Sequence, residues 1–408
     1  YSRDSSRVLA QYFNGFAGYK TKFDAATEMY AALAQIHPGY EKRLYDYTSR
    51  YIDYLLKHKG PEWHRFKAFM FYWYLGGNIK SAMVNGTQNL ITAAPALGVY
   101  SGKSGYRAII KAMTDVARQN VTKEEANFLE RMKAEGITRD LLTSELMGAP
   151  NNIFQKRLLP GGLKALRFFF SSVEVFNRET TALAFYRSAR AKGVKLGADV
   201  ENVVADAVRQ THFSYGKVDR PQLGRGRKGV LLTFRLFSIQ YVQFMKNLIK
   251  DGEYAAAGKS AGMMLALSGM KGLFAFELIN TGLGWATGDD LEERIRFYTN
   301  KAAESLLGKS YPRSVKAIER IVTRGIPAAF GVDFSGSLGA GDMIPQGDLL
   351  DLIGAPGGLI KSAEMARRDF KAGNYSRALE TMSPEFLRNP QAAIRLVREG
   401  MVTHGGTP

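Results

Sequence analysis

Apolar side chains recur every three or four residues along much of the chain, which is the spacing of one face of an α-helix. Residues 2–60 carry two such stripes, separated by a helix-breaking His-Pro-Gly sequence at 37–39, and predict an antiparallel helix pair. No stretch alternates apolar and polar residues with the period of two that a strand requires. The pattern therefore predicts an all-α, multi-helix protein, elongated or bundle-like, with glycine-rich irregular loops and no substantial sheet.

The longest helix indicated by the pattern covers residues 163–192, and Gly193 ends it. Within this helix Glu174 stands four residues before Arg178, which is the favourable direction for an ion pair along a helix. We expect a structural ion-pair cluster there. The alternative is that Glu174, Arg178 and Glu179 are functional groups with perturbed pKa values.

Two stretches are rich in apolar residues, and both are interpreted as helices that pack in a core. Seven aromatic residues lie between Trp63 and Tyr74, on several sides of one helix. Residues 254–288 are apolar and glycine-rich, but they include three charged residues, at 259, 271 and 277. They therefore contain no uncharged run near the roughly 20 residues that a spanning helix needs.

Contact with a membrane is the alternative for both stretches, because Trp and Tyr settle at membrane interfaces and a short apolar hairpin can insert after a conformational change. Assembly of several copies would use the same side chains. The candidate residues for membrane or assembly contact are Trp63, Phe66, Trp73, Met263, Met264, Phe274 and Trp285.

The 408 residues are enough for several domains, and we expect three. Residues 1–160 form an N-terminal helical domain, and residues 161–253 a domain with the long helix and a basic loop. Residues 254–408 contain the apolar glycine-rich helices and a C-terminal helical tail. No charged segment followed by an apolar run opens the chain at Tyr1, so no secretory signal is expected.

The formal net charge is +18, and the excess of basic residues lies before residue 261. It is concentrated between Arg209 and Lys250, where nine Lys or Arg residues accompany a single acid, Asp219. Such an imbalance indicates attraction to nucleic acid or to an anionic membrane. The candidate residues for binding DNA or another anion are Arg220, Arg225, Arg227, Lys228, Arg235, Lys246 and Lys250.

This basic segment combines a glycine-rich loop at 224–229 with a helix predicted from Val230 to Ile249. The start of a helix favours a phosphate group, because its free N–H groups carry partial positive charge. A solvated loop without any ligand remains the alternative. The aromatic side of the helix should face the protein and its acid-free side the water. The aromatic side holds Phe234, Phe237, Tyr241 and Phe244, and the other side holds Gln240, Gln243, Lys246, Asn247 and Lys250.

The sequence lacks the motifs of several kinds of catalytic and cofactor site. It has no cysteine, which excludes disulfides, thiolate zinc sites and cysteine nucleophiles. Three Gly-Lys-Ser sequences lack the earlier glycine of a phosphate-binding loop, and Gly224-x-Gly226-x-x-Gly229 lacks the strand and the acid of a dinucleotide site. The five histidines show no metal-ligand spacing, and His212 is interpreted as a structural residue. We expect no metal and no cofactor.

Several stretches together resemble the C-terminal portions of very large internal virion proteins of tailed phages and related phage polyvalent proteins. They are residues 77–98, 175–193, 207–249 and 324–345, and the resemblance covers about residues 70–350. It implies a protein stored inside the capsid of a short-tailed phage, ejected before the genome, and placed in the host periplasm and inner membrane as part of a conduit.

The resemblance also implies partners. They are further copies of the chain, other phage internal or ejection proteins, the backbone of double-stranded DNA bound without sequence preference, and the surface of the host inner membrane. A conduit of this kind needs a basic lining that does not read bases. The expected function is therefore structural and not enzymatic.

Two other functions remain open. An enzyme module acting on peptidoglycan or nucleic acid could use Glu174 or Glu304, since Glu304-Ser305 matches the Glu-Ser pair of lytic transglycosylases. A polyvalent protein that protects DNA, delivered with the genome, could use the same basic residues.

Overall fold

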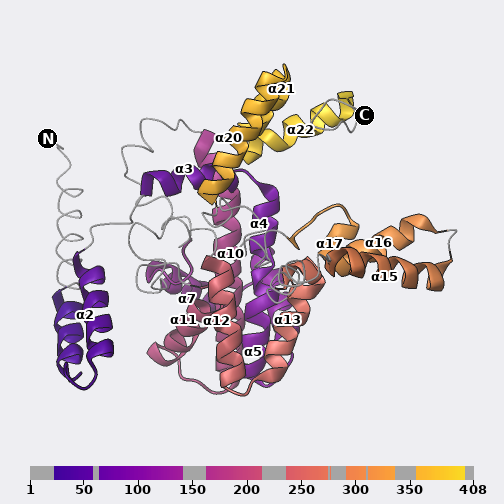
Figure 1. The fold of residues 1–408 in the computed structure, drawn as a ribbon. Coiled ribbons are helices and arrows are strands. Elements are labelled where there is room, and N and C mark those ends of the chain that lie inside the picture. Colours follow the sequence, from indigo (N-terminus) through magenta and orange to yellow (C-terminus); the bar gives the residue numbers. More distant parts are fainter. Residues whose placement is uncertain are drawn as a thin grey trace.

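The structure is a computed structural model that describes residues 23–57, 64–140, 162–213, 236–273, 276, 291–308, 311–335 and 355–399. The regular elements in these ranges are helices, and no strand occurs in them. This confirms the predicted all-α class. Figure 1 shows the helices gathered around a central group, with further helices at three places on its outside.

Of the predicted N-terminal pair, the structure describes a helix over residues 23–34 and α2 (Lys42–Lys57), whereas the first predicted apolar stripe, before residue 23, lies outside the described residues. His37 lies in the turn between them, and its Nδ1 accepts hydrogen bonds from the backbone N–H groups of Gly39 at 3.1 Å and Tyr40 at 3.3 Å. The predicted break therefore has a local cause, because a side chain binds backbone groups that a continued helix would have used. The two helices lie side by side in Figure 1.

The long helix expected over 163–192 is α10 (Gly162–Ala191), which runs through the middle of the molecule in Figure 1. Gly193 follows it with φ of 81°, the left-handed conformation that commonly ends a helix. Six shorter elements pack around α10. They are α4 (Ile79–Gly86), the π-helix η1 (Asn89–Ala93), α5 (Ala94–Ser101), α6 (Gly105–Ala117), α7 (Lys123–Ala134) and α11 (Ala198–Thr211).

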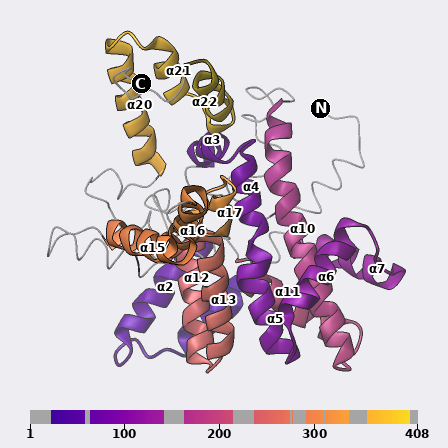
Figure 2. The same cartoon turned by 90° about the vertical axis from the view of Figure 1, so that its right-hand side faces the viewer.

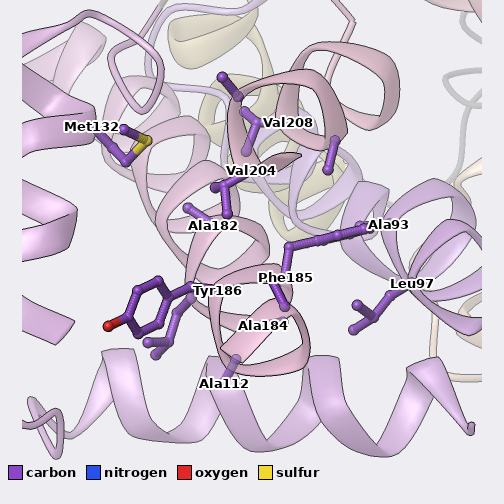
Figure 3. Close-up of a cluster of buried hydrophobic side chains, with 14 of the residues drawn as sticks. Ala93, Leu97, Ala112, Met132, Ala182, Ala184, Phe185, Tyr186, Val204 and Val208 are labelled. Atoms are coloured by element: carbon purple, nitrogen blue, oxygen red, sulfur yellow. The ribbon is translucent and has the colours of Figure 1, made fainter. Parts of the chain in front are cut away.

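These elements enclose the largest core, which Figure 3 shows in close-up. Leu97, Ile109, Leu183 and Val204 are fully buried in it, and the rings of Phe128 and Tyr186 stack with centroids 4.3 Å apart. The core draws on residues between 93 and 208, so helices from both sides of the predicted boundary at residue 160 share one core.

A second layer consists of α12 (Leu236–Lys250), α13 (Tyr254–Ser268) and the short 3-10 helix η4 (Met270–Gly272). Ser260 of α13 donates a hydrogen bond to the carbonyl of Ile91 in η1, with an O–O distance of 2.7 Å. Met264 is 1% exposed and packs with Ile91 and Phe334. The expectation that this apolar region is core is confirmed for α13.

The remaining helices lie outside these layers, as Figures 1 and 2 show. One group contains α15 (Leu291–Leu307), α16 (Pro312–Arg324) and α17 (Ile326–Ala329). The other contains α20 (Ala355–Lys371), α21 (Tyr375–Thr381) and α22 (Glu385–Glu399), and α22 contacts α3 (His64–Tyr74). Across the described helices, none combines the length and the apolarity that crossing a bilayer demands.

Gly105 is required by the close crossing of α5 and α6. A Cβ atom at this position would lie 1.9 Å from the carbonyl oxygen of Ala94 and 2.6 Å from the backbone nitrogen of Gly98. Both neighbours are backbone atoms of the adjacent helix and cannot move aside without displacing it. Gly258, in contrast, lies in α13 with nothing within 4 Å of such a Cβ atom.

We expect Gly105→Ala to lower the free energy of unfolding by about 3 kcal/mol, because α5 and α6 must separate to admit the methyl group. Gly258→Ala is the matched control and should raise stability by about 0.5–1 kcal/mol, since alanine favours a helix. Urea unfolding followed by circular dichroism measures both. Equal stability of the two variants would contradict the crossing described here.

Candidate functional site

The predicted aromatic side of α12 faces the protein. Phe213, which is 4% exposed, contacts Phe237 and Phe244 edge to face, with ring centroids 5.6 and 6.4 Å apart. The rings of Phe237 and Tyr241 stack at 6.3 Å. The expectation that α12 is anchored through its aromatic residues is therefore confirmed for these three side chains, whereas Phe234 and the predicted helix start at Val230 lie outside the described residues.

The opposite side of α12 is exposed and contains no acid. Gln243, Lys246, Asn247 and Lys250 face the solvent there, as expected. The prediction is wrong for Gln240, because this side chain is partly buried and its Oε1 is enclosed by the protein. Lys246 and Lys250 are thus accessible to an anion. The other five predicted anion-binding residues lie outside the described residues, namely Arg220, Arg225, Arg227, Lys228 and Arg235.

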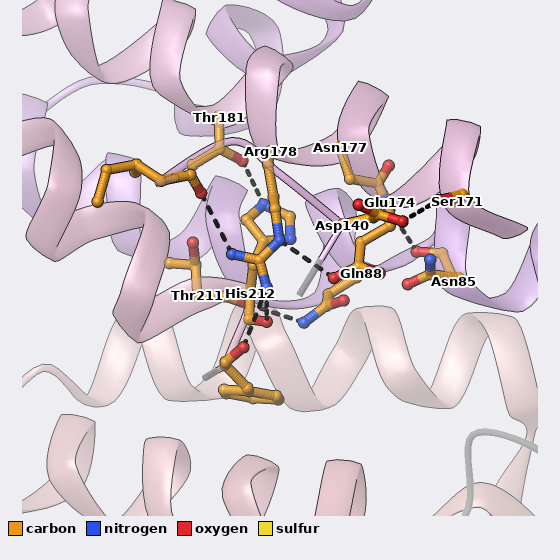
Figure 4. Close-up of polar contacts among 12 residues, drawn as sticks. Asn85, Gln88, Asp140, Ser171, Glu174, Asn177, Arg178, Thr181, Thr211 and His212 are labelled. Atoms are coloured by element: carbon orange, nitrogen blue, oxygen red, sulfur yellow. Dashed lines mark hydrogen bonds and ion pairs between the residues drawn. The ribbon is translucent and has the colours of Figure 1, made fainter. Parts of the chain in front are cut away.

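A buried polar cluster lies where the basic segment leaves the core, and we call it the Arg178 cluster (Figure 4). The guanidinium group of Arg178 is 1% exposed, and its Nε pairs with the Glu174 carboxylate at 3.3 Å. It also donates to the carbonyls of Ile137 at 3.4 Å, His212 at 3.2 Å and Phe213 at 3.2 Å. One side chain of α10 therefore holds two separate chain segments.

Amide and hydroxyl side chains from the π-helix region complete the Arg178 cluster. Gln88 Nε2 and Thr92 Oγ1 both donate to the carbonyl of Thr211, at 3.1 and 2.7 Å. Asn89 Nδ2 donates to Asn177 Oδ1 at 3.2 Å, and Thr181 Oγ1 donates to Asn89 Oδ1 at 2.9 Å. Residues 211–213 are consequently held from both sides, directly before the predicted basic loop.

His212 is the titratable member of the Arg178 cluster and is 2% exposed. Its Nε2 lies 2.6 Å from Thr181 Oγ1. Since the Thr181 hydroxyl donates its proton to Asn89, His212 Nε2 must be the donor in this contact. Burial and the neighbouring Arg178 hold the pKa of His212 well below its usual value, so the imidazole is neutral. The structural interpretation of His212 agrees with this geometry.

The predicted ion pair between Glu174 and Arg178 is confirmed. Glu174 is 5% exposed, so its carboxylate does not face a substrate in solution. Glu179 is half-buried, and its pKa is raised, because the effect of burial exceeds the opposite effect of Lys133. Glu304, the other acid considered for catalysis, is exposed on α15.

A second charged cluster joins α6, α7 and α10 through Arg187. Its Nε and Nη1 lie 2.7 Å from Glu125 Oε1 and 2.5 Å from Asp115 Oδ2. The hydrogen bonds from Arg187 lower the pKa of both carboxyl groups. Nearby, burial and a hydrogen bond to Glu124 raise the pKa of Tyr186 to about 12. Each acid in this cluster has an internal partner, which indicates a structural role.

The structure describes four of the seven predicted membrane or assembly residues, two on α3 and two on α13. Phe66 and Trp73 are partly buried on α3, where Trp73 packs against Phe69 with centroids 5.4 Å apart. Met263, on α13, is partly buried against the cluster of Ile91, Met264 and Phe334. The prediction is wrong for Met264, because this side chain is buried and has no exposed surface that a membrane or another copy could contact. Trp63, Phe274 and Trp285 lie outside the described residues.

The amides and threonines of the Arg178 cluster were not found from the sequence. Their signal is weak but present, since Gln88 and Asn89 stand four and three residues before Thr92 in a stretch of small apolar residues. No group of three His, Asp or Glu residues suited to a metal ion occurs among the described residues. Comparison with known proteins identifies no matching family model, curated protein or solved structure.

We expect the stability of the fold to fall as the pH drops from about 6.5 to 5, because of His212. The imidazole of the unfolded chain takes up a proton near pH 6.5, whereas the buried one resists it. Acid therefore favours the unfolded state. For one such group, the free energy of unfolding falls by up to about 1.4 kcal/mol for each pH unit. His212→Gln should remove this part of the slope, since its amide can still donate to Thr181.

The control is His37→Gln, because His37 is exposed in the N-terminal turn. Urea unfolding at several pH values between 5 and 7 measures all three proteins. This window lies above the pH at which the carboxyl groups of Asp115 and Glu125 take up protons. If His212→Gln keeps the full slope, the buried neutral imidazole is not its source.

Proposed function

We propose that this chain is a structural, non-enzymatic internal virion protein of a tailed phage. It is ejected into the host envelope, where several copies contribute to a conduit for the viral genome. The observation that carries the proposal is the arrangement of α12, which is anchored through its aromatic side and presents an acid-free side with Lys246 and Lys250 to the solvent. The resemblance of four sequence stretches to phage internal proteins supplies the biological setting.

The chemistry of the basic segment suits a DNA backbone. Its cations are Lys and Arg in a glycine-rich loop and on one helix side, with a single acid among them. Such a surface attracts phosphates regardless of sequence, which a conduit for a whole genome requires. The Arg178 cluster supports the same role, because it fixes residues 211–213 at the base of this segment.

Exposed apolar side chains support the proposal that the chain assembles. On the C-terminal helices, Phe370, Tyr375 and Leu379 are 62%, 58% and 70% exposed. Large apolar side chains exposed at neighbouring positions are typical of interaction surfaces. The burial of Glu174 against Arg178 favours a structural role over catalysis by that acid.

DNA binding by this segment is tested by its dependence on salt. We expect the variant with Arg225, Arg227, Lys228, Arg235, Lys246 and Lys250 all replaced by Gln to bind duplex DNA more weakly. The slope of log affinity against log salt should become less negative by about five, since each phosphate contact contributes about 0.9. The matched control replaces six exposed cations elsewhere with Gln: Lys103, Lys111, Arg118, Lys123, Lys195 and Lys371.

Fluorescence titration of labelled duplexes at several salt concentrations measures the slopes. The control should keep most of the original slope, because nonspecific net charge alone does not create phosphate contacts. An unchanged slope in the first variant would show that these residues do not contact DNA. Equal losses in both variants would show that only the net charge matters.

The location of the protein during infection tests the function itself. We expect quantitative mass spectrometry to find several copies in purified particles of the phage that encodes the chain. Minutes after infection these copies should appear in the periplasmic or inner-membrane fraction of the host. Copies that reach only the cytoplasm would favour the DNA-protecting function, and absence from the particle would overturn both and favour an enzyme.

A further inference from the structure

The helices α15 and α16 form an arm on the outside of the molecule, and we call this pair the α15–α16 hairpin. Figure 1 shows it projecting to the right, with the end of α15 and the start of α16 farthest from the central group. At its base, Glu292 pairs with Lys271 at 2.6 Å and with Arg296 at 3.2 Å, and Arg296 pairs with Glu319 at 3.0 Å. Ion pairs therefore connect the two helices to each other and to η4.

Two glycines allow the base of the hairpin to lie close against the end of α13. Gly269 ends α13 and Gly325 ends α16, and both have positive φ angles, of 65° and 89°. A Cβ atom at Gly269 would lie 2.3 Å from the backbone nitrogen of Arg324, and one at Gly325 would lie 2.4 Å from the carbonyl carbon of Leu267. The base of the hairpin is thus fixed against the second layer, while its length extends outward.

The outer side of α15 mixes aromatic and basic residues. Arg294, Phe297, Tyr298 and Lys301 follow one another at helical spacing, opposite the buried Ala303, and all four are exposed. Phe297 is 62% exposed and Tyr298 is 66% exposed, and their rings contact each other edge to face at 5.5 Å. This side therefore combines apolar and charged residues, and no element of the described chain covers it.

The far end of the hairpin is apolar, and the hairpin as a whole has more basic than acidic residues. Leu306 is 83% exposed, and Tyr311, across the turn, is 62% exposed. Residues 291–324 contain eight Lys or Arg residues and four acids. Two of these acids are held by ion pairs at the base, and the other two, Glu293 and Glu304, are exposed. The exposed cations that make no ion pair within the described residues include Lys301, Arg313 and Lys316.

This combination fits the surface of an anionic membrane better than other partners. Aromatic rings and leucines gain by entering the boundary between headgroups and acyl chains, while Lys and Arg remain beside the anionic headgroups. A DNA backbone would leave Leu306 and Phe297 in water, because phosphates offer no apolar contact. A protein interface fits less well, because Lys is depleted from the centres of such interfaces, although aromatic residues and Arg are enriched there.

We propose that the outer side and the far end of the α15–α16 hairpin bind the interface of an anionic lipid membrane. The hairpin lies on the bilayer and does not cross it, since α15 has 17 residues and carries charges along its length. Phe297, Tyr298 and Leu306 enter the interface, and Lys301, Arg313 and Lys316 face the headgroups. The inference depends on the proposed function in one respect only, namely the identity of the host membrane that the protein contacts.

The test uses the full chain and sedimentation with lipid vesicles. We expect binding to vesicles of phosphatidylcholine with one quarter phosphatidylglycerol, and much weaker binding to phosphatidylcholine alone. The apolar variant replaces Phe297, Tyr298 and Leu306 with Ser and should bind roughly tenfold more weakly. The basic variant replaces Lys301, Arg313 and Lys316 with Gln. Each cation beside an anionic surface contributes about fivefold, so this variant should lose roughly a hundredfold.

Exposed apolar residues elsewhere offer a matched control for the apolar variant. Phe168, Leu196 and Tyr254 are of the same residue types and are 65%, 52% and 69% exposed. Their replacement with Ser should leave vesicle binding unchanged. The control for the basic variant replaces Lys111, Arg118 and Lys195 with Gln. Circular dichroism verifies that all variants keep their helices.

Three outcomes would overturn this proposal. Unchanged vesicle binding by the apolar and basic variants would show that the hairpin is not the contact. Equal losses in the matched controls would show that no particular surface is involved. Loss of self-association in the apolar variant, without loss of vesicle binding, would identify a protein interface instead. The salt dependence of DNA binding should not change in the hairpin variants, so a failure here is distinct from a failure of the DNA-binding residues.

Discussion

The central fold depends on one buried cation, the guanidinium group of Arg178. Transfer of such a charge out of water costs several kcal/mol unless it is paired and hydrogen-bonded. Here Glu174 supplies the opposite charge, and three backbone carbonyls, of Ile137, His212 and Phe213, accept hydrogen bonds from Nη1 and Nη2. Because these carbonyls belong to segments that follow α7 and α11, the charge can be buried only when all of these parts are in place. The hydrogen bonds from Arg178 to His212 and Phe213 thereby couple the long helix to the start of the basic segment.

The helices themselves could be predicted where a regular apolar stripe meets a clear stop. The prediction of a helix over 163–192 agrees with α10 (Gly162–Ala191), since Gly193 adopts the left-handed conformation that the sequence suggests. The anchoring side of α12 follows from the spacing of Phe237, Tyr241 and Phe244 for the same reason. Local spacing decides such features, and it is fully visible in the sequence.

The Arg178 cluster could not be predicted in this way, because its contacts join residues far apart in the chain. Asn89 and Thr181 are 92 positions apart, and Gln88 reaches the carbonyl of Thr211 across 123 positions. The same limit applies to Met264, which looks like a surface candidate in an apolar glycine-rich helix until Ile91 and Phe334 cover it. It applies to the domain boundary near residue 160 as well, since only the three-dimensional packing shows helices from both sides sharing a core.

The two surfaces proposed for binding lie on elements that are attached differently, and this difference suits different tasks. The helix α12 of the second layer packs against Phe213, which follows α11, so its basic side keeps a fixed position relative to the core. The α15–α16 hairpin is joined through ion pairs and a close glycine contact at one end, and its apolar residues extend beyond the core. A lipid interface tolerates variation in orientation, because it presents no specific pocket, whereas several phosphates must be met at once along a duplex. A rigidly held basic helix and an outlying amphipathic arm therefore allow one chain to contact both partners without competition between them.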